Sequence, residues 1–214
     1  MKSTDKPSIP LPALLADVRR LLKKYNCTLQ LHQVRAQFMG AIASPVEQVN
    51  PALEVKTLWD GQLPNFASVV AANELMQVLA MGLWNHLASL AESAEPFELT
   101  ESTPEFTEKA LKAAAKLRYD ELQSFLLGFF QGQDNLRLSP EICDCLDVLE
   151  DLIGMFNGIA LLPNQPLAAT VLNIRSLIDQ IAELTQIAQR EINQIIALRS
   201  QYSQPDDKAS PTFH

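Results

Sequence analysis

The sequence predicts an all-α fold: a single multi-helix domain, orthogonal or bundle-like, with a long C-terminal helix. Three observations favour this class. The 214 residues include only 7 Gly and 3 Tyr, whereas a sandwich or barrel needs frequent tight turns and β-branched strands. Apolar residues recur three and four positions apart along most of the chain. Cap signatures built from Ser or Thr, Pro and Glu precede several of these apolar runs.

The chain is long enough for one packed domain. With 47% apolar and 20% charged residues, it has the composition of a globular protein rather than a disordered one. The polar ends differ from this average, so we expect residues 1–9 and 204–214 to be disordered tails. Residues 10–203 are then expected to form the single helical domain.

The first half of the domain predicts short helices and a connector. A helix over 13–24 has one apolar stripe and basic residues at its C-terminal end, where cations complement the helix dipole. A second helix covers 28–43. Ser44-Pro45-Val46-Glu47 has the form of a capping box and predicts a short helix that Asn50-Pro51 interrupts. Residues 55–66 contain an Asp-Gly turn signal and a proline, so we expect a connector there.

Two helices are predicted next, separated by an acidic loop over 92–103. Residues 68–91 are expected to form a helix that is buried on nearly all sides, because 75–91 carry no formal charge. After the loop, Thr103 caps a helix that begins at Pro104 and runs to Gln131. A break of this helix near Tyr119 is an alternative.

The last two helices have the clearest patterns. Ser139-Pro140-Glu141 repeats the cap signature, and Gly154 and Gly158 are expected to weaken the end of the helix that follows. The final helix is predicted over 167–202. At 1.5 Å per residue its length is about 50 Å, against an expected domain diameter on the order of 35 Å. Part of it should therefore project, bend or meet a partner.

Charge and cysteine content limit the classes of partner and compartment. The net charge of −8 disfavours binding to nucleic acid or to an anionic membrane, since both require a positive surface. Nucleic-acid binding would need a basic face assembled from four neighbouring residues, namely Arg19, Arg20, Lys23 and Lys24. An odd number of cysteines and the lack of a secretory signal favour the cytoplasm. The uncharged residues 75–91 fall short of the about 20 that a membrane span needs.

No residue pattern predicts catalysis, a metal or a cofactor. Cys143 and Cys145 are two apart, so on a helix they point about 200° from each other and cannot both face one metal ion without distortion of the helix. His86 lacks a neighbouring catalytic signature, and His32 is similarly isolated. We therefore expect no enzymatic activity.

Two surfaces could bind another protein. Asp144, Asp147 and Asp151 recur three and four apart and share one helix face, which either docks a basic partner or is simply solvated. The wide apolar face of the last helix, including Ile192, Ile195 and Ile196, either completes the core or pairs with another chain. The partner would be an unidentified protein or a second copy in a homodimer.

Two stretches of the chain resemble the YecA/YgfB-like family of bacterial proteins. The first stretch contains Phe38-Met39-Gly40-Ala41-Ile42-Ala43-Ser44-Pro45, then Pro51, Leu58-Trp59-Asp60-Gly61, Pro64-x-Phe66 and a helix with Met81, Leu83, Trp84 and Asn85. The second is Leu122-Gln123-Ser124-Phe125-Leu126-Leu127-Gly128-Phe129. The resemblance covers roughly residues 30–155. It implies an all-helical cytoplasmic protein with no established enzymatic activity. The zinc-binding SEC-C segment that many relatives carry at the C-terminus is absent from this sequence.

The sequence thus leads to two functional hypotheses. The first is a helical adaptor or regulator that binds another protein through the last helix or the acidic face. The alternative is a small-ligand carrier or an enzyme with a pocket between helices, lined by Trp59, Phe66, Trp84 and His86.

Overall fold

A computed structural model describes residues 10–46, 49–102, 105–133, 135–162 and 171–199. All regular elements within these ranges are helices, which confirms the all-α fold. The predicted tails at 1–9 and 204–214 lie outside the described residues. None of the helices in the described ranges combines the length and the apolarity that crossing a membrane requires.

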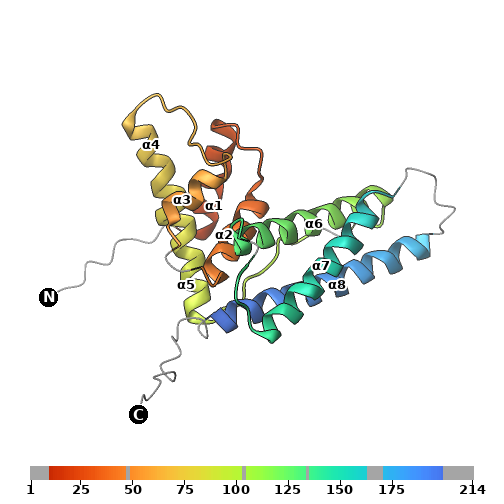
Figure 1. The fold of residues 1–214 in the computed structure, drawn as a ribbon. Helices are drawn as coiled ribbons and strands as arrows, with labels where there is room; N and C mark the ends of the chain where they lie inside the picture. The colour runs from red at the N-terminus through yellow and green to blue at the C-terminus, as the bar shows by residue number, and fades with distance from the viewer. Residues whose placement is uncertain (1–9, 47–48, 103–104, 134, 163–170, 200–214) are drawn as a thin grey trace, which may run out of the picture.

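The N-terminal half consists of short helices packed against one long rod (Figure 1). Helices α1 (Leu11–Lys24), α2 (Leu31–Ala43) and α3 (Pro51–Thr57) come first. The rod follows, because α4 (Val69–Met76), the π-helix η1 (Gln77–Trp84) and α5 (Asn85–Ser93) continue one another without a gap. Its start was predicted correctly: the Ser68 hydroxyl accepts a hydrogen bond from the amide of Ala71.

The helix predicted directly after Ser44 is not observed at residues 44–46 or 49–50. The Ser44 hydroxyl instead donates to the carbonyl of Phe129 (2.6 Å) and so ties the end of α2 to a distant helix. The next helix begins at Pro51, since the side-chain oxygen of Asn50 caps it through the amide of Ala52. The Asn50-Pro51 pair therefore starts a helix rather than interrupting one.

The expectation that the rod is buried on nearly all sides is wrong. One face is buried, with Leu75, Leu79, Leu83 and Leu87 in the core, whereas Val69, Val70 and Met81 are more than half exposed. These four leucines are each four residues apart. In an α-helix, which has 3.6 residues per turn, side chains at this spacing would shift gradually around the helix axis. The wider π-helical turns of η1 offset this drift and keep the four leucines on one face.

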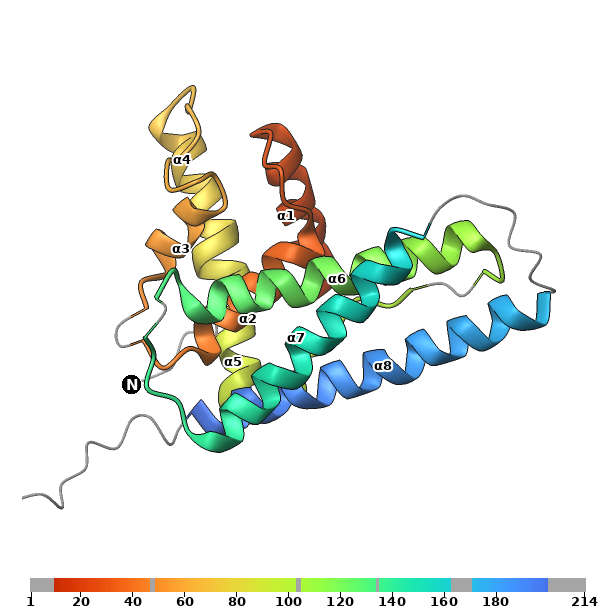
Figure 2. The ribbon, with the colours of Figure 1, turned by 45° about the vertical axis from the view of Figure 1, so that its right-hand side comes forward.

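The C-terminal half is an elongated arm of three helices, α6 (Glu108–Phe130), α7 (Pro140–Ala160) and α8 (Val171–Leu198). Figure 2 shows them side by side along the arm, and each contacts the other two. Helix α6 begins at Glu108 and not at Pro104, because the Thr107 hydroxyl caps the amide of Ala110. It continues without a break past Tyr119. Residues 103–104 lie outside the described part of the chain.

The long last helix does not project from the domain. The described part of α8 has 28 residues, about 42 Å at 1.5 Å per residue. Because α6 and α7 run beside it, the arm as a whole is elongated. The side chains of α8 that face these neighbours are buried: Ile181, Ala188, Ile192, Ile195 and Ile196.

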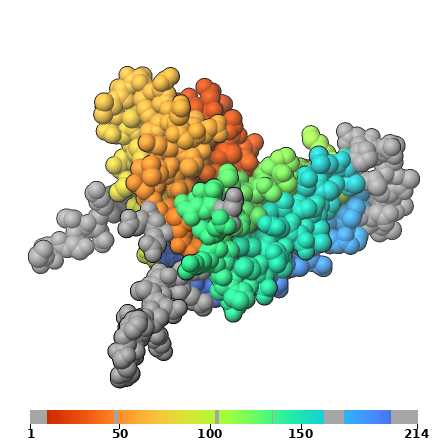
Figure 3. Space-filling model, viewed as in Figure 1, coloured from red at the N-terminus to blue at the C-terminus, as the bar shows by residue number. Residues whose placement is uncertain are grey.

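The two halves meet where α2 packs against α6 (Figure 3 shows them as two lobes in contact). Gly40 on α2 lies against the carbonyl of Phe125, and Gly128 on α6 lies against the carbonyl of Gln37. A Cβ atom at either glycine would collide with the opposing backbone. Glycine is therefore required here for the close approach of two helices.

A strap over residues 97–100 also joins the halves, and side chains hold its backbone. The Asn193 amide accepts from the Phe97 N–H (2.7 Å) and donates to the Phe97 carbonyl (3.0 Å). Gln189 accepts from the amide of Leu99. The buried pair Arg118 and Glu121 holds Thr100, with Glu121 accepting from its amide and Arg118 donating to its carbonyl.

Candidate functional site

A groove of about 540 Å³ lies between α1 and α2 and is lined by basic side chains. Residues 25–30 connect the two helices in a turn that includes Asn26 in the left-handed region (φ 50°). The charged and titratable residues that line the groove are Arg19, Lys23, Arg35, His32 and Cys27. No aspartate or glutamate is among its lining residues in the described part of the chain.

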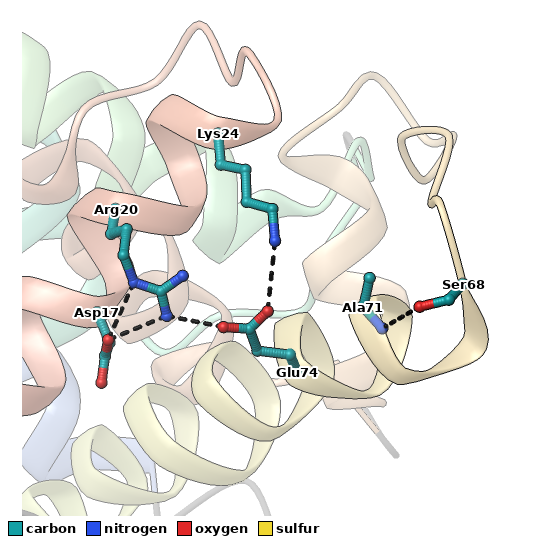
Figure 4. Close-up of polar contacts among 6 residues, drawn as sticks. All are labelled: Asp17, Arg20, Lys24, Ser68, Ala71 and Glu74. Atoms are coloured by element: carbon teal, nitrogen blue, oxygen red, sulfur yellow. Dashed lines mark hydrogen bonds and ion pairs between the residues drawn. The ribbon is translucent and has the colours of Figure 1, made fainter.

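The four cations of α1 divide between two faces of the helix. Arg20 donates to Glu74 (2.8 Å) and to Asp17 (3.0 Å), and Lys24 lies 3.4 Å from the other oxygen of Glu74 (Figure 4). The hydrogen bond that Arg20 donates lowers the pKa of Glu74. Glu74 of α4 therefore supplies a negative charge that offsets the positive charges of Arg20 and Lys24. Arg19 and Lys23 line the groove and form no ion pair with any described residue.

Arg35 is held in place from a different element. Its Nη2 donates to the carbonyl of Glu98 (3.0 Å), and its guanidinium lies 5.4 Å from the ring centre of Phe97. Burial is the main cause that lowers the pKa of Arg35; the charges of Glu121 and Glu98 raise it, and the charge of Arg19 lowers it. An arginine nevertheless stays protonated in proteins. The strap therefore positions a fixed positive charge at the groove.

His32 stands in the first turn of α2 and lines the same groove. Burial lowers its pKa, and Arg118 and Lys116 lower it further, against the raising effect of Glu121 and Asp120. The ring is therefore neutral at pH 7. Its Nε2 is buried without a hydrogen-bond partner among the described residues.

The structure does not bring the four residues of the predicted pocket together around one described cavity: Trp59 lines a cavity of about 320 Å³ whose lining includes none of Phe66, Trp84 and His86. The Trp59 indole donates to the carbonyl of Tyr25 (3.0 Å), and Phe66 packs edge-on against the Tyr25 ring. Trp84 is 7% exposed and packs against Phe38 in the core. These aromatic side chains are used in packing, and His86 is absent from the lining of the basic groove.

The two predicted interaction surfaces have different outcomes. Asp144, Asp147 and Asp151 are exposed along α7 and make no ion pair with a described residue. Ile192, Ile195 and Ile196 are buried within the core of this chain, so of the two alternatives the apolar face of the last helix completes the core, and these three residues are not available to a partner. The apolar face of α8 packs against α6 and α7, the other two helices of the arm.

The cysteine pair of α7 follows the predicted geometry, with Cys143 exposed and Cys145 buried. The described residues contain no group of three or more His, Cys, Asp or Glu side chains placed to hold a metal ion.

Sequence reasoning missed the basic groove, although one signal for it was present. In Arg19-Arg20-x-x-Lys23-Lys24 each Arg is four residues before a Lys, and residues four apart share a helix face. The pattern therefore predicts two basic pairs on adjacent helix faces, Arg19 with Lys23 and Arg20 with Lys24, and not one basic face formed by all four residues. The contribution of Arg35 depends on tertiary packing and has no local signal.

Comparison of the chain with known protein families, with characterised proteins and with solved structures gives no match. The resemblance to the YecA/YgfB-like family therefore stays a prediction.

Proposed function

We propose that this protein is a cytoplasmic adaptor or regulator without enzymatic activity, which binds an acidic segment of a partner protein in the groove between α1 and α2. We also propose that it is a YecA/YgfB-like protein without the zinc-binding C-terminal segment. The observation that carries the binding proposal is the lining of the groove. Arg19, Lys23 and Arg35 line it, and no carboxylate is among its lining residues in the described part of a chain that has 25 acidic and 17 basic residues.

The exposure of two of these cations favours a protein segment as the ligand. Arg19 and Lys23 are exposed at the groove, and Arg35 is partly buried with its guanidinium fixed by the strap. Such an arrangement supplies charge-assisted hydrogen bonds to carboxylates on a segment lying across an open groove. A long polyanion such as nucleic acid is disfavoured, because the rest of the surface carries the excess negative charge.

Binding of a fluorescein-labelled decaglutamate peptide, followed by fluorescence anisotropy at low salt, tests the proposal. The double variant Arg19→Gln/Lys23→Gln is expected to bind about tenfold more weakly or worse, since a tenfold change corresponds to about 1.4 kcal/mol. Added salt should weaken binding to the native protein.

The same helix offers a matched control. Arg20→Gln/Lys24→Gln removes the same charge from the adjacent face and is expected to change the affinity by less than about threefold. An equal loss in both double variants would mean non-specific attraction and would contradict the proposal. A 12-nucleotide single strand or inorganic phosphate that displaces the peptide at lower concentration than unlabelled decaglutamate would also contradict it.

The exposed aspartates of α7 support a second binding surface, for a basic segment. Asp144, Asp147 and Asp151 lie on one side of the helix without an ion pair to a described residue. A labelled decalysine peptide should lose affinity for the triple Asp→Asn variant while decaglutamate binding is retained. If self-association at low salt is abolished both by this variant and by Arg19→Gln/Lys23→Gln, the partner is a second copy of the chain.

A further inference from the structure

A second cavity, of about 410 Å³, lies on the other side of α2, where α3 meets the C-terminal end of α6. Figure 2 shows α3 near this end of α6. The side chains that line the cavity are Gln37, Glu54, Thr57, Asp60, Leu127 and Gln131. No lysine, arginine or histidine is among the lining residues in the described part of the chain.

Glu54 is the first reason to assign a ligand to this cavity. The residue is only 7% exposed, yet its carboxyl group forms no hydrogen bond or ion pair with any described residue. The side chain is largely buried although its oxygens are not fully sealed from solvent, and a largely buried carboxylate in a native protein normally has a hydrogen-bonding partner.

Gln37 is an independent second reason. It is 2% exposed, and its Nε2 donates to the Thr57 hydroxyl (2.8 Å), which in turn donates to the carbonyl of Glu54 (2.8 Å). Because the Thr57 proton is already used, the Gln37 amide must present its nitrogen to Thr57. Its Oε1 is then left as a buried acceptor without a partner among the described residues.

The surroundings add further negative potential. The Asp60 carboxylate lines the cavity, and the 23-residue helix α6 directs its C-terminal end there, with Gln131 as C-cap. The C-terminal end of a helix carries partial negative charge. The buried atom of Gln131 that lacks a partner among the described residues is its Nε2, and a half-turn of the amide would place the oxygen there instead.

From these contacts we infer that the cavity binds a primary alkylammonium group. An ammonium supplies three donors and a positive charge, which match the carboxylates of Glu54 and Asp60 and the Gln37 oxygen, while the C-terminal end of α6 adds negative potential. Leu127 is 60% exposed beside them and offers an apolar wall for the methylene chain. The same chemistry is found in a free diamine and in a lysine side chain of a partner protein.

Isothermal titration calorimetry with two probes tests this inference and separates the two sources. The probes are putrescine and the peptide acetyl-Gly-Lys-Gly-amide, and 1,4-butanediol serves as an uncharged control of matched length. Binding of either ammonium probe supports the site, and the stronger of the two identifies the source. Binding of neither, or equal binding of 1,4-butanediol, overturns the inference.

Variants locate the binding. Glu54→Gln keeps the shape of the side chain and is expected to weaken binding at least tenfold. Asp60→Asn should weaken it a few-fold, and it is expected to fold because asparagine tolerates the left-handed backbone of this residue (φ 53°). Glu150→Gln, on the exposed side of α7, is the matched control and should bind as the native protein does.

Unchanged binding in both Glu54→Gln and Asp60→Asn would overturn the inference. Binding of Mg²⁺ that displaces putrescine and depends equally on Glu54 would also overturn it in favour of a metal. The experiment is independent of the groove between α1 and α2, so its failure leaves the proposed function untouched.

Discussion

Glu54 is the carboxyl group whose burial has the clearest consequence for stability. Burial raises its pKa above the ordinary value. At a pH below the unfolded-state pKa both states are protonated, and the group has no effect. As pH rises through the interval up to the folded-state pKa, the unfolded chain ionises first, and stability is lost.

Glu54→Gln is therefore expected to raise the melting temperature at pH 7. A largely buried carboxylate without a partner costs on the order of 1 kcal/mol, which corresponds to about 2–4 °C for a chain of this size. The difference should shrink toward pH 4, where the native side chain is increasingly protonated. Thermal denaturation followed by circular dichroism measures this, and an equal difference at both pH values would contradict the account.

The three cysteines are expected to differ in reactivity. Burial, with a contribution from Glu191, raises the pKa of Cys145 to about 12, and this residue is 2% exposed. Cys27 is half-buried, and burial raises its pKa as well. Iodoacetamide at pH 8 should thus alkylate the exposed Cys143 within minutes and leave Cys145 unmodified in the folded protein. Peptide mass mapping, with Cys143→Ser as control, checks the order; rapid labelling of Cys145 would contradict it.

At the scale of elements, the crossing of α2 and α6 depends on two glycines. Gly40→Ala places a methyl group against the Phe125 carbonyl and is expected to cost about 1–3 kcal/mol or more. Gly154→Ala on α7 is the matched control, because no atom of the described residues lies within 4 Å of its added Cβ. This change should stabilise the helix by up to about 1 kcal/mol. Urea denaturation of both variants tests the crossing, and similar effects in the two would contradict it.

Of the three cap signatures in the sequence, the one at Ser139 marks an observed helix start, whereas no helix follows Ser44 directly and the helix expected after Thr103 begins at Glu108. Ser68 and Ser139 precede α4 and α7 as expected. The π-helical stretch could not be predicted, since its sequence has the apolar content of any buried helix. The rod was expected to be buried all round for the same reason: an uncharged segment does not reveal how many neighbours cover it.

At the scale of the whole molecule, the strap connects the arm to the N-terminal half. Asn193→Ala removes both hydrogen bonds to the backbone of Phe97 and is expected to cost about 1–3 kcal/mol. Hydrogen exchange at the amides of Phe97 and Leu99 should accelerate more than exchange along α1. Asn73→Ala, at an exposed position of α4, is the control and should change neither. Unchanged exchange in Asn193→Ala would contradict the role of the strap.

The fold class followed from helical periodicity, whereas the candidate site did not follow from the sequence. The groove joins cations of α1 to Arg35 of α2, and Arg35 is positioned by the carbonyl of Glu98. Arg35 and Glu98 are 63 positions apart in the sequence, so no local residue pattern indicates that they are in contact. The net charge of −8 also hid the groove, because a total charge does not report how the charges are distributed. The sequence also left open whether Ile192 completes the core or pairs with another chain, because the packing of α6 and α7 against α8 is not visible in the periodicity of α8 alone.

The most direct test of the proposed function is a titration of the ¹⁵N-labelled protein with decaglutamate, followed by two-dimensional NMR. The account predicts that the largest amide shifts lie in the second half of α1, in the turn after it and in the first turns of α2, with Thr100 also affected. Shifts centred on α7, or spread evenly over the molecule without a maximum at the groove, would contradict it.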